Sequence, residues 1–151
     1  MTPQRDEYKV AQMAQKGDPN KFKYIIMQDI IDVAPGIPKI IMKENLHRGC
    51  MWWRPEIKSE QELNDLAASV QAIFETSVDV LQCWAKKRTG SKNLALAGGG
   101  ALNKTAIDKI RPNWKSVWVP PNPGDPGSCI GAVLAKIKTK VVLDKQWYQK
   151  L

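Results

Sequence analysis

Residues 94–103 read LALAGGGALN, and this stretch decides the predicted fold. A short apolar run typical of a buried strand leads into three glycines, Gly98 to Gly100, and then into a segment with helical character. Glycines let a ligand approach the backbone where a Cβ would collide, and amides at a helix N-terminus attract anions. A joint of this kind is equally often only a tight turn, so both interpretations stay open at this point.

A second stretch downstream has the same layout. Residues 117–128 read VWVPPNPGDPGS, in which several prolines stiffen a loop that directly follows a predicted strand. The loop presents one carboxylate, Asp125, before a predicted helix. Asp125 either belongs to the turn or caps that helix, or it faces a metal ion or a phosphate.

The clearest helix signal precedes both stretches. Ser59 and Glu62 match a capping box, and apolar residues then recur at helical spacing as far as Arg88. Phe74 and Trp84 lie on this apolar stripe, so we expect both to be buried against a sheet. Further helices are predicted at 6–16, 20–32, 101–110 and 128–137, and strands at 40–43, 93–97 and 117–119. This alternation of helices and strands predicts an α/β fold with helices packed on a central sheet.

The composition fits a globular chain. The 151 residues are 43% hydrophobic and 25% charged, which argues against disorder. Apolar runs are too short to cross a membrane, and no signal-peptide stretch opens the sequence, so we expect a cytoplasmic protein with no membrane partner. Three widely spaced cysteines and a single histidine, His47, argue against a disulfide framework and against a metal site built on paired histidines.

The chain is basic, with 23 Lys and Arg against 15 Asp and Glu and a formal net charge of +8. Such a charge favours an anionic ligand, either a phosphate or a nucleic acid. The densest basic groups lie at predicted helix ends, where the helix dipole favours cations. A solvated surface therefore explains most of the charge. No recognised motif supports a small basic nucleic-acid-binding protein, which stays as the less favoured alternative.

Taken together, the two stretches resemble the O-carbamoyltransferases of nodulation-factor and antibiotic biosynthesis. That family has an AGGVALN-type turn followed by VxPPxPGDxGxxxGA, and the matching text here is AGGGALN at 97–103 and VPPNPGDPGSCIGAVLA at 119–135. Two upstream stretches agree with the family, DEYKV at 6–10 and DLAASVQ at 65–71. The resemblance covers roughly residues 5–136.

The resemblance implies one lobe of an actin-like ATPase fold, also called ribonuclease H-like. Members of the family bind ATP or a carbamoyl-adenylate between two lobes and pass the carbamoyl group to a substrate hydroxyl. We therefore expect residues 1–140 to form the C-terminal lobe of the nucleotide-binding domain and residues 141–151 to form a tail.

The resemblance also implies a set of binding residues. Gly98, Gly99 and Asn103 would contact the nucleotide. Asp125 would contact a divalent metal, Mg or Fe, beside the nucleotide phosphates. Weaker candidates for ribose or phosphate contact are Glu7 and Lys9. No catalytic residue is assigned.

Departures from the family pattern limit the expected activity. The family's two metal-binding histidines and its C-terminal domain have no match in this sequence, and His47 is predicted to be non-catalytic. Pro126 stands where the family has a small residue, and Ala11–Gln12 replaces a Met–Gly pair. We therefore expect a fragment or subunit that needs a missing N-terminal lobe or a partner subunit, or that self-associates, and that acts on a small-molecule hydroxyl acceptor. The alternative is a catalytically inert nucleotide-binding remnant.

Overall fold

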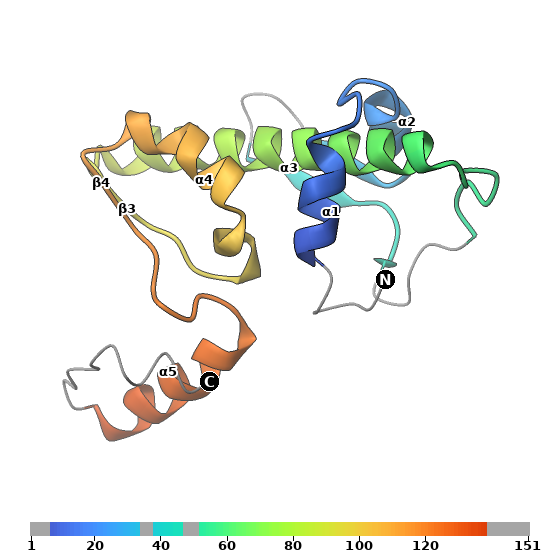
Figure 1. Ribbon diagram of the computed structural model, residues 1–151. Coiled ribbons are helices and arrows are strands. Elements are labelled where there is room, and N and C mark those ends of the chain that lie inside the picture. The colour runs from blue at the N-terminus through green and yellow to red at the C-terminus, as the bar shows by residue number, and fades with distance from the viewer. Residues whose placement is uncertain (1–6, 34–37, 47–51, 139–151) are drawn as a thin grey trace. The chain divides into compact units, whose positions relative to one another are not determined.

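The computed structural model describes residues 7–33, 38–46 and 52–138 (Figure 1). The chain divides into two compact units, residues 1–88 and 89–151. Helices and short strands occur in both, which is compatible with the α/β class. The strands within the described ranges pair as two separate two-stranded sheets and do not form the expected central sheet.

The first unit contains three helices and an antiparallel strand pair. Its elements are α1 (Glu7–Ala14), α2 (Lys23–Asp29), β1 (Ile31–Val33), β2 (Ile40–Met42) and α3 (Glu60–Thr89). The helix expected at 20–32 is too long, because its last residues leave α2 and pair with β2, Ile31 opposite Met42 and Val33 opposite Ile40. β-Branched side chains favour this extended conformation. The strand expected at 40–43 is confirmed.

Helix α3 begins where the capping box predicts. Ser59 N donates to Glu62 Oε2 at 3.2 Å, and Glu62 N donates to Ser59 Oγ at 3.3 Å. The helix extends for 30 residues, and no helix among the described ranges is both long and apolar enough to span a membrane.

The expected burial of the α3 stripe is only partly found. Ile73 packs into a buried cluster with Ile26, Ile30 and Val33, against which Val80 is half-buried. Phe74 is half-buried, and Trp84 is 46% exposed, so the burial predicted for Trp84 is wrong for this chain. Trp84 lies one turn beyond Val80, the last α3 residue that packs against this cluster.

The second unit follows the predicted order of strand, glycine turn, helix, strand, loop and helix. Its elements are β3 (Asn93–Ala95), η2 (Gly99–Leu102), α4 (Lys104–Ile110), η3 (Arg111–Asn113), β4 (Ser116–Trp118) and α5 (Asp125–Ile137). Strands β3 and β4 are parallel, with Leu94 opposite Val117 and Ala95 opposite Trp118. Among its described residues, this unit buries apolar side chains of α4 and of the residues that follow it, namely Ala106, Ile107, Ile110 and Trp114.

Two expectations for the second unit need correction. The helix expected at 101–110 starts only at Lys104, because the glycines first form the 3-10 turn η2. The strand expected at 117–119 was predicted to be buried, yet Trp118 is 59% exposed. The pair β3–β4 gains no third strand from the described ranges, so both of its edges lack a further strand there.

Candidate functional site

The two glycine-containing stretches meet at one edge of the parallel pair. Strands β3 and β4 run in the same direction, and Leu96 N donates to Trp118 O at 2.9 Å just beyond the paired residues. Both loops start from this edge. In open parallel sheets, ligands bind outside the carboxyl ends of the strands. We call the loop residues 98–99 and 122–125 the carboxyl-end site.

A backbone hydrogen bond joins the two loops of this site. Gly98 N donates to Pro123 O at 2.6 Å. Gly98 adopts φ 88°, a conformation that favours glycine because a Cβ would crowd the backbone. The sequence predicts two ligand-facing loops, and the structure shows that they are in contact with each other.

Gly99 has no comparable structural reason to be glycine. A Cβ built on Gly99 meets no atom within 4 Å, and the residue is exposed. A side chain therefore fits there as far as the described residues are concerned. The open backbone at Gly99 is consistent with the close approach of a ligand.

Asn103 lies directly before the first residue of α4, as the N-cap of this helix. Its side-chain Oδ1 accepts a hydrogen bond from Ala106 N at 3.1 Å, which is a helix cap. Asn103 therefore has a structural role whether or not it also contacts a ligand.

Asp125 is the first residue of α5 and is exposed. The loop before it is tightly folded, because Gly127 N donates to Gly124 O at 3.0 Å and a Cβ on Gly127 would collide with the backbone of Asn122. The side-chain Nδ2 of Asn122 is buried without a hydrogen-bond partner. The structure thus fixes the position of Asp125 through its neighbours, and the carboxylate stands in the first turn, where the helix dipole favours it.

The described residues do not form a metal site by themselves. No group of three or more His, Cys, Asp or Glu side chains suited to a metal ion occurs among them, so Asp125 would need ligands from elsewhere. His47 and Cys50 lie outside the described residues. Cys83 and Cys129 are free and exposed, with Gln82 Nε2 3.0 Å from Cys83 Sγ.

Positive charge is concentrated in the unit that holds the carboxyl-end site. Residues 89–151 contain 10 Lys and Arg and 3 Asp and Glu, a net of +7, whereas residues 1–88 contain 13 and 12, a net of +1. One of the three acids, Asp108, is paired with Lys104 and Arg111, and the Lys104 bond is the main cause that lowers the pKa of the Asp108 carboxyl. The field of this unit therefore favours an anionic ligand.

The two weaker candidates lie in the first unit, on α1. Glu7 is the first residue of the helix, and its side chain lies outside the described part of the structure. Lys9 is exposed, and its ammonium group stands 5.8 Å from the centroid of the Tyr8 ring.

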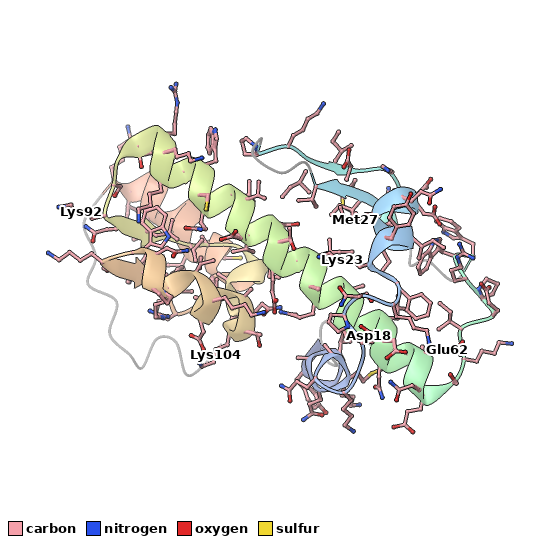
Figure 2. The ribbon with its side chains drawn as sticks, turned by 90° about the horizontal axis from the view of Figure 1, so that it is seen from above. Asp18, Lys23, Met27, Glu62, Lys92 and Lys104 are labelled. Atoms are coloured by element: carbon pink, nitrogen blue, oxygen red, sulfur yellow. The ribbon has the colours of Figure 1, made fainter. Side chains whose placement is uncertain are left out.

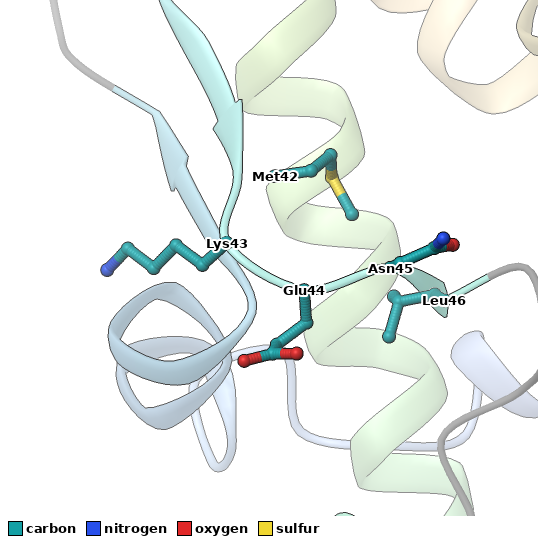
Figure 3. Close-up of a pocket in the computed structure, with 5 residues that line it drawn as sticks. All are labelled: Met42, Lys43, Glu44, Asn45 and Leu46. Atoms are coloured by element: carbon teal, nitrogen blue, oxygen red, sulfur yellow. The ribbon is translucent and has the colours of Figure 1, made fainter.

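A pocket in the first unit is lined, among the described residues, by none of the predicted site residues. It is formed by the segment that follows β2, from Met42 to Leu46 (Figure 3). Lys43 Nζ donates to Met27 O at 3.0 Å and to Gln28 O at 2.8 Å, which satisfies carbonyls at the end of α2. The lysine of this pocket therefore stabilises a helix terminus, and we assign the pocket no chemistry.

Comparison with known proteins adds independent information. Residues 1–134 match the family described as "Carbamoyltransferase N-terminus". The uncharacterized protein sll1178 of Synechocystis sp. is 31% identical over 146 residues, covering 85% of this chain and 24% of that protein. Nodulation protein NolO of Bradyrhizobium diazoefficiens is 30% identical over 134 residues, covering 85% of this chain and 24% of that protein.

A third relative matches a shorter stretch. Nodulation protein U of Rhizobium fredii is 39% identical over 71 residues, which cover 43% of this chain and 12% of that protein. The chain thus spans about a quarter or less of the length of these relatives.

Proposed function

The chain belongs to the carbamoyltransferase family, and from this premise we propose that its carboxyl-end site binds ATP or a carbamoyl-adenylate. The observation that supports this most directly is the hydrogen bond from Gly98 N to Pro123 O, which joins the two family motifs at the carboxyl ends of parallel strands. The fold we propose for the whole domain is the actin-like ATPase fold, with this chain supplying one lobe.

Two features of the second unit support nucleotide binding. The backbone at Gly99 is open, so a phosphate or ribose can approach it closely. The net charge of +7 attracts a polyanionic ligand. We keep Asn103 as a contact residue beside its role as helix cap, and we propose Glu7 and Lys9 of the first unit as further ribose or phosphate contacts.

The proposed reaction is transfer of the carbamoyl group to a hydroxyl of a small-molecule acceptor. The hydroxyl oxygen attacks the carbamoyl carbon and gives up its proton to solvent, the bond from that carbon to the adenylate phosphate oxygen breaks, and AMP leaves. The residues of the carboxyl-end site bind and orient the nucleotide, which lowers the entropic cost of the encounter.

Asp125 needs a cation if it is to face phosphates, because two negative charges at close range repel. We propose that Asp125 contributes one ligand to a divalent metal, Mg or Fe, whose other ligands come from outside the described residues. A missing N-terminal lobe, a partner subunit or a second copy of the chain is the proposed source. Exposed apolar side chains in the second unit support such an association, namely Leu102, Trp118, Val133 and Ile137.

Titration with ATP and magnesium tests the nucleotide site. Gly99→Val should weaken ATP binding by about tenfold or more while the thermal melting temperature stays unchanged, because the position is open in the chain alone. Gly131→Val is the matched control, since a Cβ at Gly131 in α5 also meets no atom within 4 Å. Equal affinity of wild type and Gly99→Val would place the nucleotide elsewhere.

Nucleic-acid binding is a second candidate, and the uneven charge distribution is the observation that favours it. Such binding depends steeply on salt because counterions are released from the phosphates. Tight, salt-sensitive binding of DNA or RNA together with no response to ATP would favour this candidate over the nucleotide site.

A further inference from the structure

Asn122 carries an unpaired donor inside the loop that precedes α5. Its side-chain Nδ2 is buried and has no hydrogen-bond partner among the described residues. A buried donor without an acceptor destabilises the folded chain, because it has lost its bond to water and gained none in return. Most buried polar groups in proteins are paired, so this one calls for a partner that the described chain does not supply.

The backbone around Asn122 is fixed, so the loop cannot shift to find that partner. Asn122 lies between Pro121 and Pro123, and a residue before a proline is restricted to extended conformations. A Cβ on Gly127 would collide with the backbone oxygen of Asn122, so the first turn of α5 packs directly against this residue. On the other side, Pro123 O accepts the hydrogen bond from Gly98 N at 2.6 Å.

The side chain of Asn122 has a route to the surface of the carboxyl-end site. The residue as a whole is half-buried, although its Nδ2 is buried, and the terminal torsion of an asparagine is broad. Its neighbour Pro123 is bonded to Gly98, and the candidate metal ligand Asp125 lies three residues further along. A small rotation of the amide group therefore directs Nδ2 to the site that these residues form.

Two lysines of the second unit do not fill the role of this donor. Lys104, the first residue of α4, is paired with Asp108 of the same helix. Lys92 directly precedes β3, at the end of the strand opposite to the carboxyl-end site (Figure 2). In the structure, neither ammonium group takes the place of the Asn122 amide at this site.

We propose that Asn122 is a further ligand contact of the carboxyl-end site, whose Nδ2 donates to a phosphate oxygen of the bound nucleotide. This inference rests on the proposed nucleotide-binding function. Ionised phosphate oxygens accept hydrogen bonds and an amide N–H donates them, so the ligand satisfies the group that the chain leaves unpaired. The family pattern VxPPxPGD leaves the residue at position 122 unspecified, so this contact does not follow from the resemblance.

Titration with ATP and magnesium compares three variants of the full 151-residue chain. Asn122→Leu keeps a side chain of similar size without the donor, so ATP binding should weaken about tenfold. Asn122→Asp keeps the shape and places a negative charge against the phosphate, so the loss should be larger, about hundredfold. Asn93→Leu is the matched control, because Asn93 is exposed at the start of β3, and it should leave ATP affinity unchanged.

Thermal denaturation without ATP separates a ligand contact from a structural role. If Nδ2 is unpaired in the free chain, Asn122→Leu and the shorter Asn122→Ala should melt at the wild-type temperature or above it, because they remove a buried unpaired donor. Lower melting temperatures in both variants would show that a bound water or another group already pairs Nδ2. That result would overturn the proposal.

Gly99→Val distinguishes failure of this contact from failure of the proposed function. If Gly99→Val weakens ATP binding and Asn122→Asp binds ATP like the wild type, the nucleotide site stands and the Asn122 contact is overturned. If wild type and Gly99→Val respond to ATP alike, the proposed function has failed, and the inference falls with it.

Discussion

The two strand pairs of this protein differ in how far the chain itself covers them. In the first unit, Val33 of the antiparallel pair is buried together with Ile26, Ile30 and Ile73 of the adjoining helices. In the second unit, none of the six paired residues of β3 and β4 is buried. Parallel sheets normally have both faces covered. The comparison indicates that the first unit is stabilised by its own core, whereas the second presents its candidate site on an open surface.

The largest expected effect concerns the chemistry of the second unit. We expect the 151-residue chain, tested alone, to show no carbamoyl transfer, because a nucleotide bound at an open surface stays solvated and electrostatic stabilisation of the reacting group is then weak. The assay combines carbamoyl phosphate, ATP, magnesium or iron and a panel of hydroxylated acceptors. It is then repeated with an N-terminal lobe and a C-terminal domain from a longer relative.

Turnover by the chain alone that disappears in Asp125→Ala would contradict this expectation. It would also show that the open surface seen at β3 and β4 is sufficient for catalysis. If no added domain restores activity, the inert nucleotide-binding remnant becomes the better interpretation.

Truncating one isoleucine in the first unit and one in α5 compares a buried side chain with an exposed one. Ile30 is 6% exposed in the first unit, and Ile137 is 49% exposed at the end of α5 in the second. Ile30→Ala should lower the free energy of unfolding by about 2–5 kcal/mol, because it leaves a cavity in the core. Ile137→Ala should change it by no more than about 0.5 kcal/mol. Urea denaturation measures both, and similar losses would show that α5 is covered in solution.

Substitution of the two glycines in the carboxyl-end site should have a smaller effect on stability. Gly98 has φ 88°, whereas the backbone of Gly99 carries no such requirement and is open. Gly98→Ala should therefore destabilise the chain by about 1–3 kcal/mol through backbone strain, and Gly99→Ala should be close to neutral. Thermal denaturation of the two variants measures this difference in stability. A neutral Gly98→Ala would mean that the turn relaxes freely and that the bond to Pro123 does not constrain it.

Low pH should destabilise the first unit, because two carboxyl groups that stabilise it as carboxylates become protonated. Hydrogen bonds from Ser59 to Glu62, and from Asp18 and Gln61 to Asp65, lower the pKa of each carboxyl in the folded chain. A lowered folded-state pKa means that the stabilisation is present above the ordinary value of about 4 and is lost as pH falls through the lowered value. At pH values below about 4, the denaturation midpoint of the wild type should therefore decrease, and that of Asp65→Asn should decrease less. An identical pH profile would show that Asp65 does not contribute.

Local patterns in the sequence predict much of this fold. The Ser59–Glu62 capping box gives the start of α3, and the glycine and proline stretches give the strand–turn–helix order after residue 92. These features succeed because each depends on residues a few positions apart. The same locality explains the choice of Gly98, Gly99 and Asp125 as site candidates, whose ligand contacts stay predictions.

Other features depend on residues far apart in the chain. Strand β1 was missed because only its pairing with β2 ends the helical pattern at Asp29. The bond from Asp18 to Asp65 joins residues 47 positions apart, and no local pattern marks it. The exposure of Trp84 was not predicted either. An apolar stripe indicates which face of α3 packs, but it does not indicate how much of the helix length is covered by other elements.

The positions of the two exposed cysteines have a practical consequence. Cys83 lies in the first unit and Cys129 in the second, so the described residues offer one exposed thiol for a spectroscopic label in each unit. With Cys50 replaced by serine, a pair of nitroxides or fluorophores attached to these two thiols would report the distance between them. The distance distribution, recorded with and without ATP, would show directly whether a ligand brings the two units to one fixed separation.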